Sequence, residues 1–331
     1  MCPMLCLLPV LIIIVVAFGL NWFFRRKLLQ GEGRAVFVTG CDRGFGETLA
    51  CKLASSGYTV FAGCLDTKSD GAERLKSQYH TKATVIQIDV TNDESVAAAV
   101  RILYDRLSNI GLWAVVNNAG VAVFAETEWC SMEAYNKVLG VNLLGGIRVT
   151  KACLPLVRAA RGRVINISSL AGRCALPGFT AYSASKYGLI GFTDSLRREM
   201  WKFGVKVISI EPKLYRTAIS DAEFHVNTNN KMWTEADDRV KLDYGDTYFR
   251  AFLDSMLRNL KISSKRTYQV IDDLMHAVSA KYPYTRYVPG VKMQIMSDMF
   301  VVQPNFVQDL GVSRQMKVKC VPFSMRSKKS V

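Results

Sequence analysis

The sequence predicts an α/β fold built on a doubly wound parallel sheet. Short apolar runs alternate with longer stretches of helical pattern between residues 34 and 219, as strands and helices alternate in such sheets. A glycine-rich turn separates the first apolar run from the first helical stretch. With 331 residues, half of them hydrophobic, the chain can bury a sizeable core.

Six apolar runs are expected to be buried strands. They are residues 35–38, 58–64, 83–88, 112–116, 164–167 and 205–210. Helical stretches lie between them, at Glu47–Ser55, Glu94–Leu107, around Asn142 and at Ala181–Arg198. Parallel strands end at one edge of the sheet, and ligands bind there. We therefore expect the residues at the strand ends to lie together at this edge. They are Gly40, Asp89, Asn117, Ser169 and Pro212.

The first expected strand runs into Gly40, and Gly44 and Gly46 stand before the first helix. Strand, glycine-rich turn and helix form the arrangement that binds dinucleotides. Glycine lets the backbone approach the pyrophosphate, and the N-terminus of the helix faces its negative charge. The fold is therefore expected to be of the Rossmann type.

The second expected strand should end against the adenosine ribose. An acid there favours NAD, and a nearby arginine favours the 2′-phosphate of NADP. The strand ends at Cys64, and Asp66 follows two positions later, while Arg43 lies inside the glycine turn. These signals oppose each other, so we expect NAD, with NADP as the alternative.

Tyr182 and Lys186 stand four residues apart in a stretch without proline, so a helix would place both on one face. A nearby positive charge lowers the pKa of a phenol, which then exchanges a proton with an alcohol or carbonyl more easily. Ser169 follows the apolar run at 164–167, and its hydroxyl could hold the same substrate oxygen.

The first 20 residues carry no charged side chain. An apolar stretch of about 20 residues is long enough to cross a bilayer as a helix. Aromatic residues at 22–24 and the basic run at 25–27 follow at once. The positive-inside rule places the rest of the chain on the cytosolic side. We expect residues 1–30 to be an uncleaved anchor with a basic flank. The membrane would be that of the endoplasmic reticulum, or of the mitochondrion as the alternative.

Residues 31–310 are expected to form a single Rossmann-type domain, and 311–331 a basic tail with six Lys/Arg and no acid. The net charge of +15 suits anionic lipid head groups. Nucleic acid is not expected, because no recognition motif accompanies the charge. The nine cysteines are scattered without a Cys-x-x-Cys pair, which indicates reduced thiols and no metal site.

Residues 220–310 are expected to select the substrate. Ser220–Val240 is polar and is predicted to be a mobile lid. Asp243–Leu260 is predicted to be a helix that packs Tyr248, Phe252 and Met256 into the core. Residues 291–306 are apolar and rich in Met. They are expected to face the membrane, the substrate, the core or a second subunit.

Several short sequences occur together in the order that is typical of one superfamily. They are Thr39-Gly40-x-x-x-Gly44-x-Gly46, Asn117-Asn-Ala119-Gly120, Asn142, Ser169 and Tyr182-x-x-x-Lys186. Over residues 34–219 the chain thus resembles the short-chain dehydrogenase/reductase superfamily. Finer features, such as Tyr284-Thr-Arg-Tyr287, resemble its membrane-bound retinol, hydroxysteroid and D-3-hydroxybutyrate dehydrogenases.

The resemblance implies roles for these residues. Tyr182 would be the acid/base and Lys186 would lower its pKa and bind the nicotinamide ribose. Ser169 would orient the substrate oxygen beside Tyr182, and Asn142 would hold a water-linked proton path. Besides Tyr182 and Lys186, the cofactor would contact Gly40, Arg43, Gly44, Phe45, Gly46, Cys64, Asp89, Val90, Asn117, Ala119, Gly120, Pro212 and Thr217.

Two positions depart from the pattern of the family. Lys213 stands where glycine usually follows Pro212, and a lysine would be strained there if the position needs a positive φ. The subgroup commonly has serine at the position of Arg43, which weakens the case for NAD.

We predict a membrane-anchored NAD(P)-dependent oxidoreductase that interconverts a lipophilic alcohol, of retinoid or hydroxysteroid type, and its carbonyl. The first alternative is a D-3-hydroxybutyrate dehydrogenase-like enzyme that acts on a small hydroxy acid. Arg173 could bind the carboxylate of such a substrate, or it could be a surface residue. The second alternative is a cofactor-binding scaffold without turnover, which Lys213 alone supports. The expected partners are the small-molecule substrate and the membrane. The superfamily includes dimers and tetramers, so a homo-oligomer is an open alternative.

Overall fold

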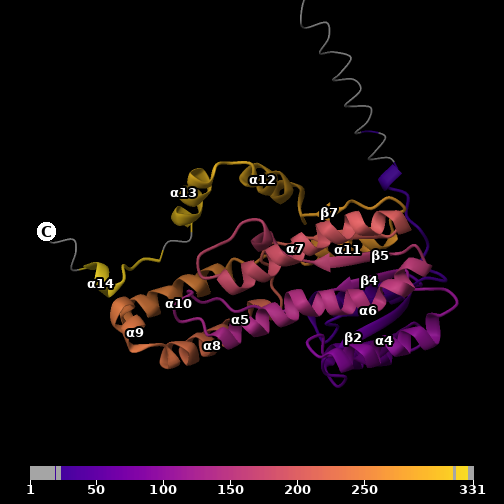
Figure 1. The fold of residues 1–331 in the computed structure, drawn as a ribbon, viewed down its shortest axis with the longest axis horizontal. Coiled ribbons are helices and arrows are strands. Elements are labelled where there is room, and N and C mark those ends of the chain that lie inside the picture. The colour runs from indigo at the N-terminus through magenta and orange to yellow at the C-terminus, as the bar shows by residue number, and fades with distance from the viewer. Residues whose placement is uncertain (1–18, 20–23, 316–317, 327–331) are drawn as a thin grey trace, which may run out of the picture.

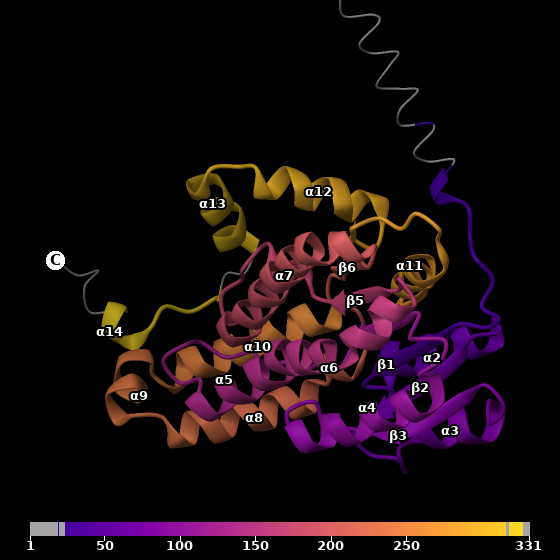
Figure 2. The same ribbon diagram turned by 45° about the vertical axis from the view of Figure 1, so that its right-hand side comes forward.

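The computed structural model describes residues 19, 24–315 and 318–326 of the chain. In this part, seven parallel strands form one sheet in the order β3-β2-β1-β4-β5-β6-β7 (Figures 1 and 2). The strands are β1 (Ala35–Thr39), β2 (Thr59–Cys64), β3 (Ala83–Gln87), β4 (Ala114–Asn117), β5 (Arg163–Ile167), β6 (Lys206–Ile210) and β7 (Arg286–Tyr287). The predicted doubly wound parallel sheet is confirmed. The order reverses between β1 and β4, the point where such sheets bind ligands.

Helices connect the strands and extend beyond the sheet. The α-helices are α2 (Gly44–Ser55), α3 (Asp70–Gln78), α4 (Asp93–Leu107), α5 (Met132–Leu139), α6 (Gly146–Ala159), α7 (Thr180–Met200), α8 (Ala222–Glu235), α9 (Asp238–Tyr244), α10 (Asp246–Lys261), α11 (Tyr268–Ser279), α12 (Val291–Val301), α13 (Asn305–Gln315) and α14 (Phe323–Arg326). A π-helix, η1 (Gly140–Gly145), and three 3₁₀ turns, η2 (Leu170–Gly172), η3 (Trp201–Phe203) and η4 (Ala218–Ser220), complete the described elements.

The sheet separates two apolar layers because side chains alternate along each strand. On β1, Val36 and Val38 belong to one buried cluster, with residues of α2, α3 and α11. Ala35 and Phe37 belong to the other, with residues of α4, α6 and the end of α7. All five residues of β1 are buried, which is why this strand reads as a continuous apolar run rather than an alternating one.

One buried cation ties the sheet to a late helix. Arg163 begins β5, and its guanidinium donates to the carbonyl oxygens of Ala277 (2.8 Å) and Ala280 (3.0 Å) at the end of α11. The same group lies 4.1 Å from the centroid of the Trp113 ring. Burial lowers the pKa of Arg163 to about 10, and the carbonyls of the helix end compensate for part of the lost hydration.

The predicted lid, Ser220–Val240, contains helix α8 and the start of α9, and α8 buries Met232 and Trp233. These side chains pack around Trp129, whose ring centroid lies 5.3 Å from that of Trp233. The mobility of this segment stays a prediction. The predicted helix at Asp243–Leu260 is confirmed as α10, and its three predicted core residues are buried.

Among the described helices, none is both long and apolar enough to cross a bilayer. Nearly all of the predicted anchor, residues 1–18 and 20–23, lies outside the described residues. The membrane-spanning helix therefore stays a prediction, and so do the domain limits at residues 30 and 310.

Candidate active site

The turn between β1 and α2 depends on its glycines. Gly40 and Gly44 have φ values of +70° and +73°, a region that favours glycine. A Cβ on Gly46 would lie 2.2 Å from the carbonyl oxygen of Gly40, so only glycine lets the helix start so close to the turn. Asn118 holds this arrangement, because its amide donates to the carbonyl oxygens of Thr39 (2.8 Å) and Gly40 (2.9 Å). Sequence reasoning assigned no role to Asn118, although it stands in the Asn-Asn-Ala-Gly motif.

The N-terminus of α2 is open for an anion. Helices α3, α4 and α5 begin with side chains that accept a backbone N–H, those of Ser69, Asn92 and Ser131. At α2 the corresponding residue, Arg43, makes no side-chain cap. A Cβ on Gly44 would meet nothing closer than Thr217, 3.9 Å away. Uncapped N–H groups beside open space suit a pyrophosphate, so this turn, with Phe45 and Gly46, fits a dinucleotide cofactor.

The end of β2 differs from what the sequence suggested. Cys64 is fully buried, and burial raises the pKa of its thiol to about 12, so the thiol offers no charge to a ribose. The carboxylate of Asp42 lies at this strand end, where it accepts the N–H groups of Leu65 (3.2 Å) and Asp66 (2.8 Å). Arg43 is exposed beside it. Sequence reasoning missed Asp42 because it belongs to the glycine turn and not to the strand.

The ends of β3 and β4 carry further predicted cofactor-binding residues. Asp89 accepts the N–H (2.8 Å) and the hydroxyl (2.7 Å) of Thr91, and Val90 is buried. Asn117 ends β4, but its side chain turns inward and donates to Thr150 and Asn166, both at 2.7 Å. Asn117 therefore braces the sheet, and the residues that follow it, Ala119 and Gly120, lie at the edge.

The three predicted catalytic side chains Ser169, Tyr182 and Lys186 come together. Tyr182 and Lys186 lie on α7, with the ammonium nitrogen 5.6 Å from the centroid of the phenol ring. Lys186 donates to the carbonyl oxygen of Ile167 at 2.9 Å. Ser169 follows β5, and its hydroxyl donates to the carbonyl oxygen of Pro212 at 3.3 Å and accepts the N–H of Ala171 at 3.1 Å. All three side chains are buried.

Asn142 lies in the π-helical stretch η1, a feature that is frequent at functional sites. Its amide binds both backbone groups of Val121, at 2.8 and 2.9 Å, and donates to the hydroxyl of Ser185 at 3.0 Å. A Cβ on Gly120 would lie 3.4 Å from the Asn142 oxygen and 3.9 Å from the Lys186 nitrogen. Asn142 and Lys186 thus flank one small space.

Burial dominates the ionisation of the pair. It raises the pKa of Tyr182 to about 12, against the hydrogen bond from Ser169, and lowers the pKa of Lys186 to about 8. Burial is the leading cause of the raised pKa of Tyr182, and the lowering of this pKa by Lys186 stays a prediction. At neutral pH Tyr182 is a phenol that can donate a proton.

Arg173 is neither a surface residue nor open to a substrate carboxylate. Its guanidinium pairs with Asp298 at 2.8 Å and with the fully buried Glu211 at 3.8 Å. Arg286 also pairs with Glu211, at 3.2 Å. Lys213 is unstrained, because Arg161 alone among the described non-glycine residues has a positive φ. The expected backbone strain at Lys213 is therefore absent.

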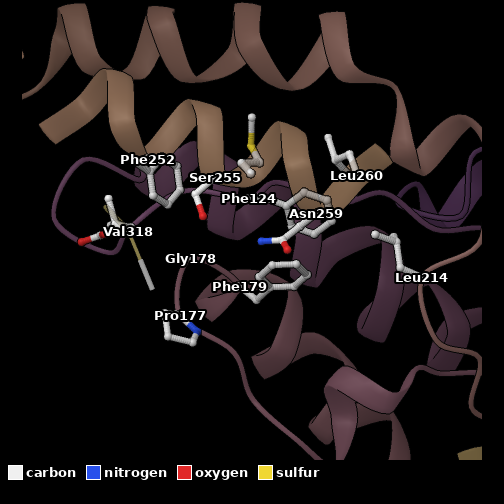
Figure 3. Close-up of a pocket in the computed structure, with 12 residues that line it drawn as sticks. Phe124, Pro177, Gly178, Phe179, Leu214, Phe252, Ser255, Asn259, Leu260 and Val318 are labelled. Atoms are coloured by element: carbon white, nitrogen blue, oxygen red, sulfur yellow. The ribbon is translucent and has the colours of Figure 1, made fainter. Parts of the chain in front are cut away.

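Residues of α10 and of the segment that leads into α7 line a cavity (Figure 3). The Phe124 ring lines it too, with its centroid 6.0 Å from that of Tyr182 and 4.3 Å from that of Phe179. Most of the wall is apolar and comes from Phe124, Pro177, Gly178, Phe179, Leu214, Phe252, Met256, Leu260 and Val318. Its polar side chains are those of Glu126, Ser255 and Asn259. Sequence reasoning had not singled out this set, apart from Phe252 and Met256 as core residues.

The model of the short chain dehydrogenase family matches residues 34–227. This chain belongs to the short-chain dehydrogenase family. It is 40% identical to rat 17-beta-hydroxysteroid dehydrogenase type 6, over 91% of this chain and 96% of the relative. It is 42% identical to mouse retinol dehydrogenase 7, over 87% and 90%. Rat mitochondrial D-beta-hydroxybutyrate dehydrogenase is also 42% identical, over 80% and 81%.

Solved structures support the same fold for this short-chain dehydrogenase. A short chain dehydrogenase from Burkholderia cenocepacia in complex with NADP superposes with a TM-score of 0.65 at 23% identity, over 86% of this chain and 99% of that one. A 3-ketoacyl-(acyl-carrier-protein) reductase from Brucella melitensis complexed with NADH superposes with a TM-score of 0.53 at 25% identity, over 57% and 78%.

Proposed function

We propose that this short-chain dehydrogenase interconverts a lipophilic alcohol of hydroxysteroid or retinoid type and its carbonyl, at a membrane surface. It is an oxidoreductase of CH–OH groups that uses a nicotinamide cofactor. The observation that carries the choice of substrate is the cavity that Phe124 lines, because its wall is mostly aromatic and aliphatic. The relatives named for hydroxysteroids and retinol support the same class.

The chain's own residues bind and protonate the substrate oxygen. The hydroxyls of Ser169 and Tyr182, both buried, would meet this oxygen. In reduction the Tyr182 phenol donates its proton to the carbonyl oxygen, and in oxidation it takes the proton back. Lys186 and Asn142 would hold the cofactor ribose and a proton path beside Gly120. The nicotinamide supplies or accepts the hydride.

The proposal includes a membrane anchor in residues 1–30 and a cytosolic catalytic domain on the endoplasmic reticulum. It rests on the uncharged run at residues 1–20 and the basic residues that follow. The mitochondrion is the alternative location. A homo-oligomer is the alternative to a monomer. NAD is the proposed cofactor and NADP the alternative, since Asp42 and Arg43 stand side by side in the turn.

A small hydroxy acid is the second candidate, which the rat D-beta-hydroxybutyrate dehydrogenase favours. Such a substrate needs a cation for its carboxylate. Arg173 is already paired with two acids, and the described residues that line the cavity include no Lys or Arg. The structure therefore favours the lipophilic alcohol.

The test is turnover by the full chain in vesicles, with all-trans-retinol, several hydroxysteroids and 3-hydroxybutyrate, each with NAD and with NADP. We expect turnover of a lipophilic alcohol that Tyr182→Phe lowers by about 10³-fold, a typical contribution of general acid–base catalysis. Turnover of 3-hydroxybutyrate alone would move the assignment to the second candidate. Cofactor binding without any turnover would support the scaffold.

A further inference from the structure

Exposed apolar side chains gather on α12 and α13, which we call the α12–α13 segment (Val291–Gln315). Val302 is 82% exposed and Phe306 is 73% exposed. Ile295, Met296, Met299 and Leu310 are also exposed. Both views show these helices standing off the body of the molecule (Figures 1 and 2). A helix that is apolar on several sides needs a cover, and the described residues provide little.

The position of the N-terminal residues indicates what covers this segment. The continuous described chain begins at Phe24, and both views place this start on the upper side of the molecule, the side on which α12 and α13 lie (Figures 1 and 2). Residues 1–20, which carry no charged side chain, therefore join the protein on this side. Arg26, Lys27 and Lys281 are exposed there, and the carbonyl oxygen of Lys27 accepts the N–H of Lys281. Apolar side chains beside basic ones match the surface of an anionic bilayer.

The α12–α13 segment is also joined to the active site. The Arg173 guanidinium donates to the carboxylate of Asp298 at 2.8 Å and to the hydroxyl of Ser297 at 3.3 Å, both on α12. Arg173 closes the short turn that begins at Ser169. The pair neutralises an acid that would otherwise face the lipid, and it fixes α12 relative to the serine that binds the substrate oxygen.

We propose that the α12–α13 segment is a second membrane contact, which lies at the boundary of head groups and acyl chains of a phospholipid bilayer. The Arg173–Asp298 pair then sets how the catalytic side chains stand relative to that surface. A lipophilic alcohol is thereby taken up from the lipid phase and not from water. This inference rests on the proposed membrane association and adds a site of contact to it.

The test uses the full chain in vesicles of phosphatidylcholine and phosphatidylserine that contain a photoactivatable phospholipid. After irradiation, we expect labelled peptides from residues 291–310. In a Met296→Glu, Phe306→Glu double variant, the amount of label on these peptides should fall about fivefold, because charged side chains oppose burial at the boundary of the acyl chains. The matched control is Leu242→Glu, at a 72% exposed leucine on α9, which should leave the label unchanged.

Turnover gives a second readout. The double variant should show a several-fold lower kcat/KM for an alcohol dissolved in the vesicles, with an unchanged value for a short water-soluble alcohol, which also shows that it folds. If the protein does not sediment with vesicles, the proposed membrane association is itself wrong. Sedimentation without label on residues 291–310 overturns this inference alone. Cross-links between the α12–α13 segments of two chains would instead assign the surface to a second copy.

Discussion

The glycine turn at the cofactor edge and the wall of the substrate cavity are built in different ways. The turn is shaped by backbone atoms, because Gly46 packs against the carbonyl oxygen of Gly40 and leaves no room for a side chain. The cavity is shaped by side chains, such as Phe179 and Phe252. A site made of backbone tolerates few sequences and binds one ligand, whereas a site made of side chains changes with each substitution. This difference explains how one fold keeps its cofactor while its substrate varies.

The largest effect is expected where the backbone leaves no space. Gly46→Ala places a Cβ 2.2 Å from the Gly40 oxygen, so the turn must move. We expect cofactor affinity, measured by calorimetric titration with NAD or NADP, to fall about 10²-fold, as misplacement by an ångström can cause. Gly191→Ala on α7 is the matched control, because its Cβ meets nothing within 4 Å. Equal affinities in the two variants would remove the argument that the turn is fixed by its backbone.

A substitution in the cavity wall should lower the turnover of the substrate and leave cofactor binding unchanged. Phe179→Ala removes an aromatic wall beside Phe124. We expect kcat/KM for a lipophilic alcohol to fall about tenfold, since the lost apolar contact is worth roughly 1.5 kcal/mol or more. Cofactor affinity should stay the same. A matching fall for a short soluble alcohol would mean that Phe179 supports the catalytic residues and not the substrate.

A substitution of Arg43 tests whether a side chain adds a preference for NADP or NAD to a site that is otherwise formed by backbone atoms. Arg43 is exposed in the turn, next to the acid Asp42. We expect Arg43→Ser to lower the ratio of kcat/KM with NADP to that with NAD by about tenfold, the loss of one charge-assisted hydrogen bond to a phosphate. An unchanged ratio would show that Arg43 is only solvated.

A separate effect is on stability and comes from the catalytic lysine. The pKa of Lys186 is lowered from 10.5 to about 8 in the folded protein. Between these pH values the unfolded chain binds more protons at Lys186, so the folded protein gains stability as pH rises from about 8 to 10.5, and loses it as pH falls. Lys186→Met lacks this dependence. The Tm of the variant minus that of the wild type should therefore be more positive at pH 7 than at pH 10, by thermal unfolding at both pH values. An equal difference at the two pH values would contradict the lowered pKa.

The strands and the catalytic set were predictable because their signals are local. The apolar run before Gly40, the glycine spacing and the four-residue step from Tyr182 to Lys186 each depend on neighbouring residues. Their order along the chain then placed Ser169 at the same edge. The roles assigned to these residues stay predictions until the variants are measured.

What the sequence did not show depends on contacts between distant segments. Arg173 reads as a free cation until Asp298, 125 residues later, is placed beside it. In the sequence, Asp42 is only a residue of the glycine turn. In the structure, its carboxylate accepts the N–H of Asp66, just after the end of β2. The pKa of Tyr182 depends on burial, which no spacing along the chain reports. The burial of Trp233 on α8 was not visible either, because mostly polar residues surround it in the sequence.

Arg163 also has a consequence for how this protein is made. Its guanidinium is paired only when Ala277 and Ala280 have been synthesised, more than a hundred residues after β5. A nascent chain that has just released residues 34–227 from the ribosome therefore holds every catalytic motif but not the carbonyls that stabilise its buried cation, nor the helix α11 that packs on α2, β5 and β6. Such a chain should stay open and dependent on chaperones until the segment around residue 280 emerges. Activity would thus appear only late in translation, when the substrate-binding helices of the same chain already exist.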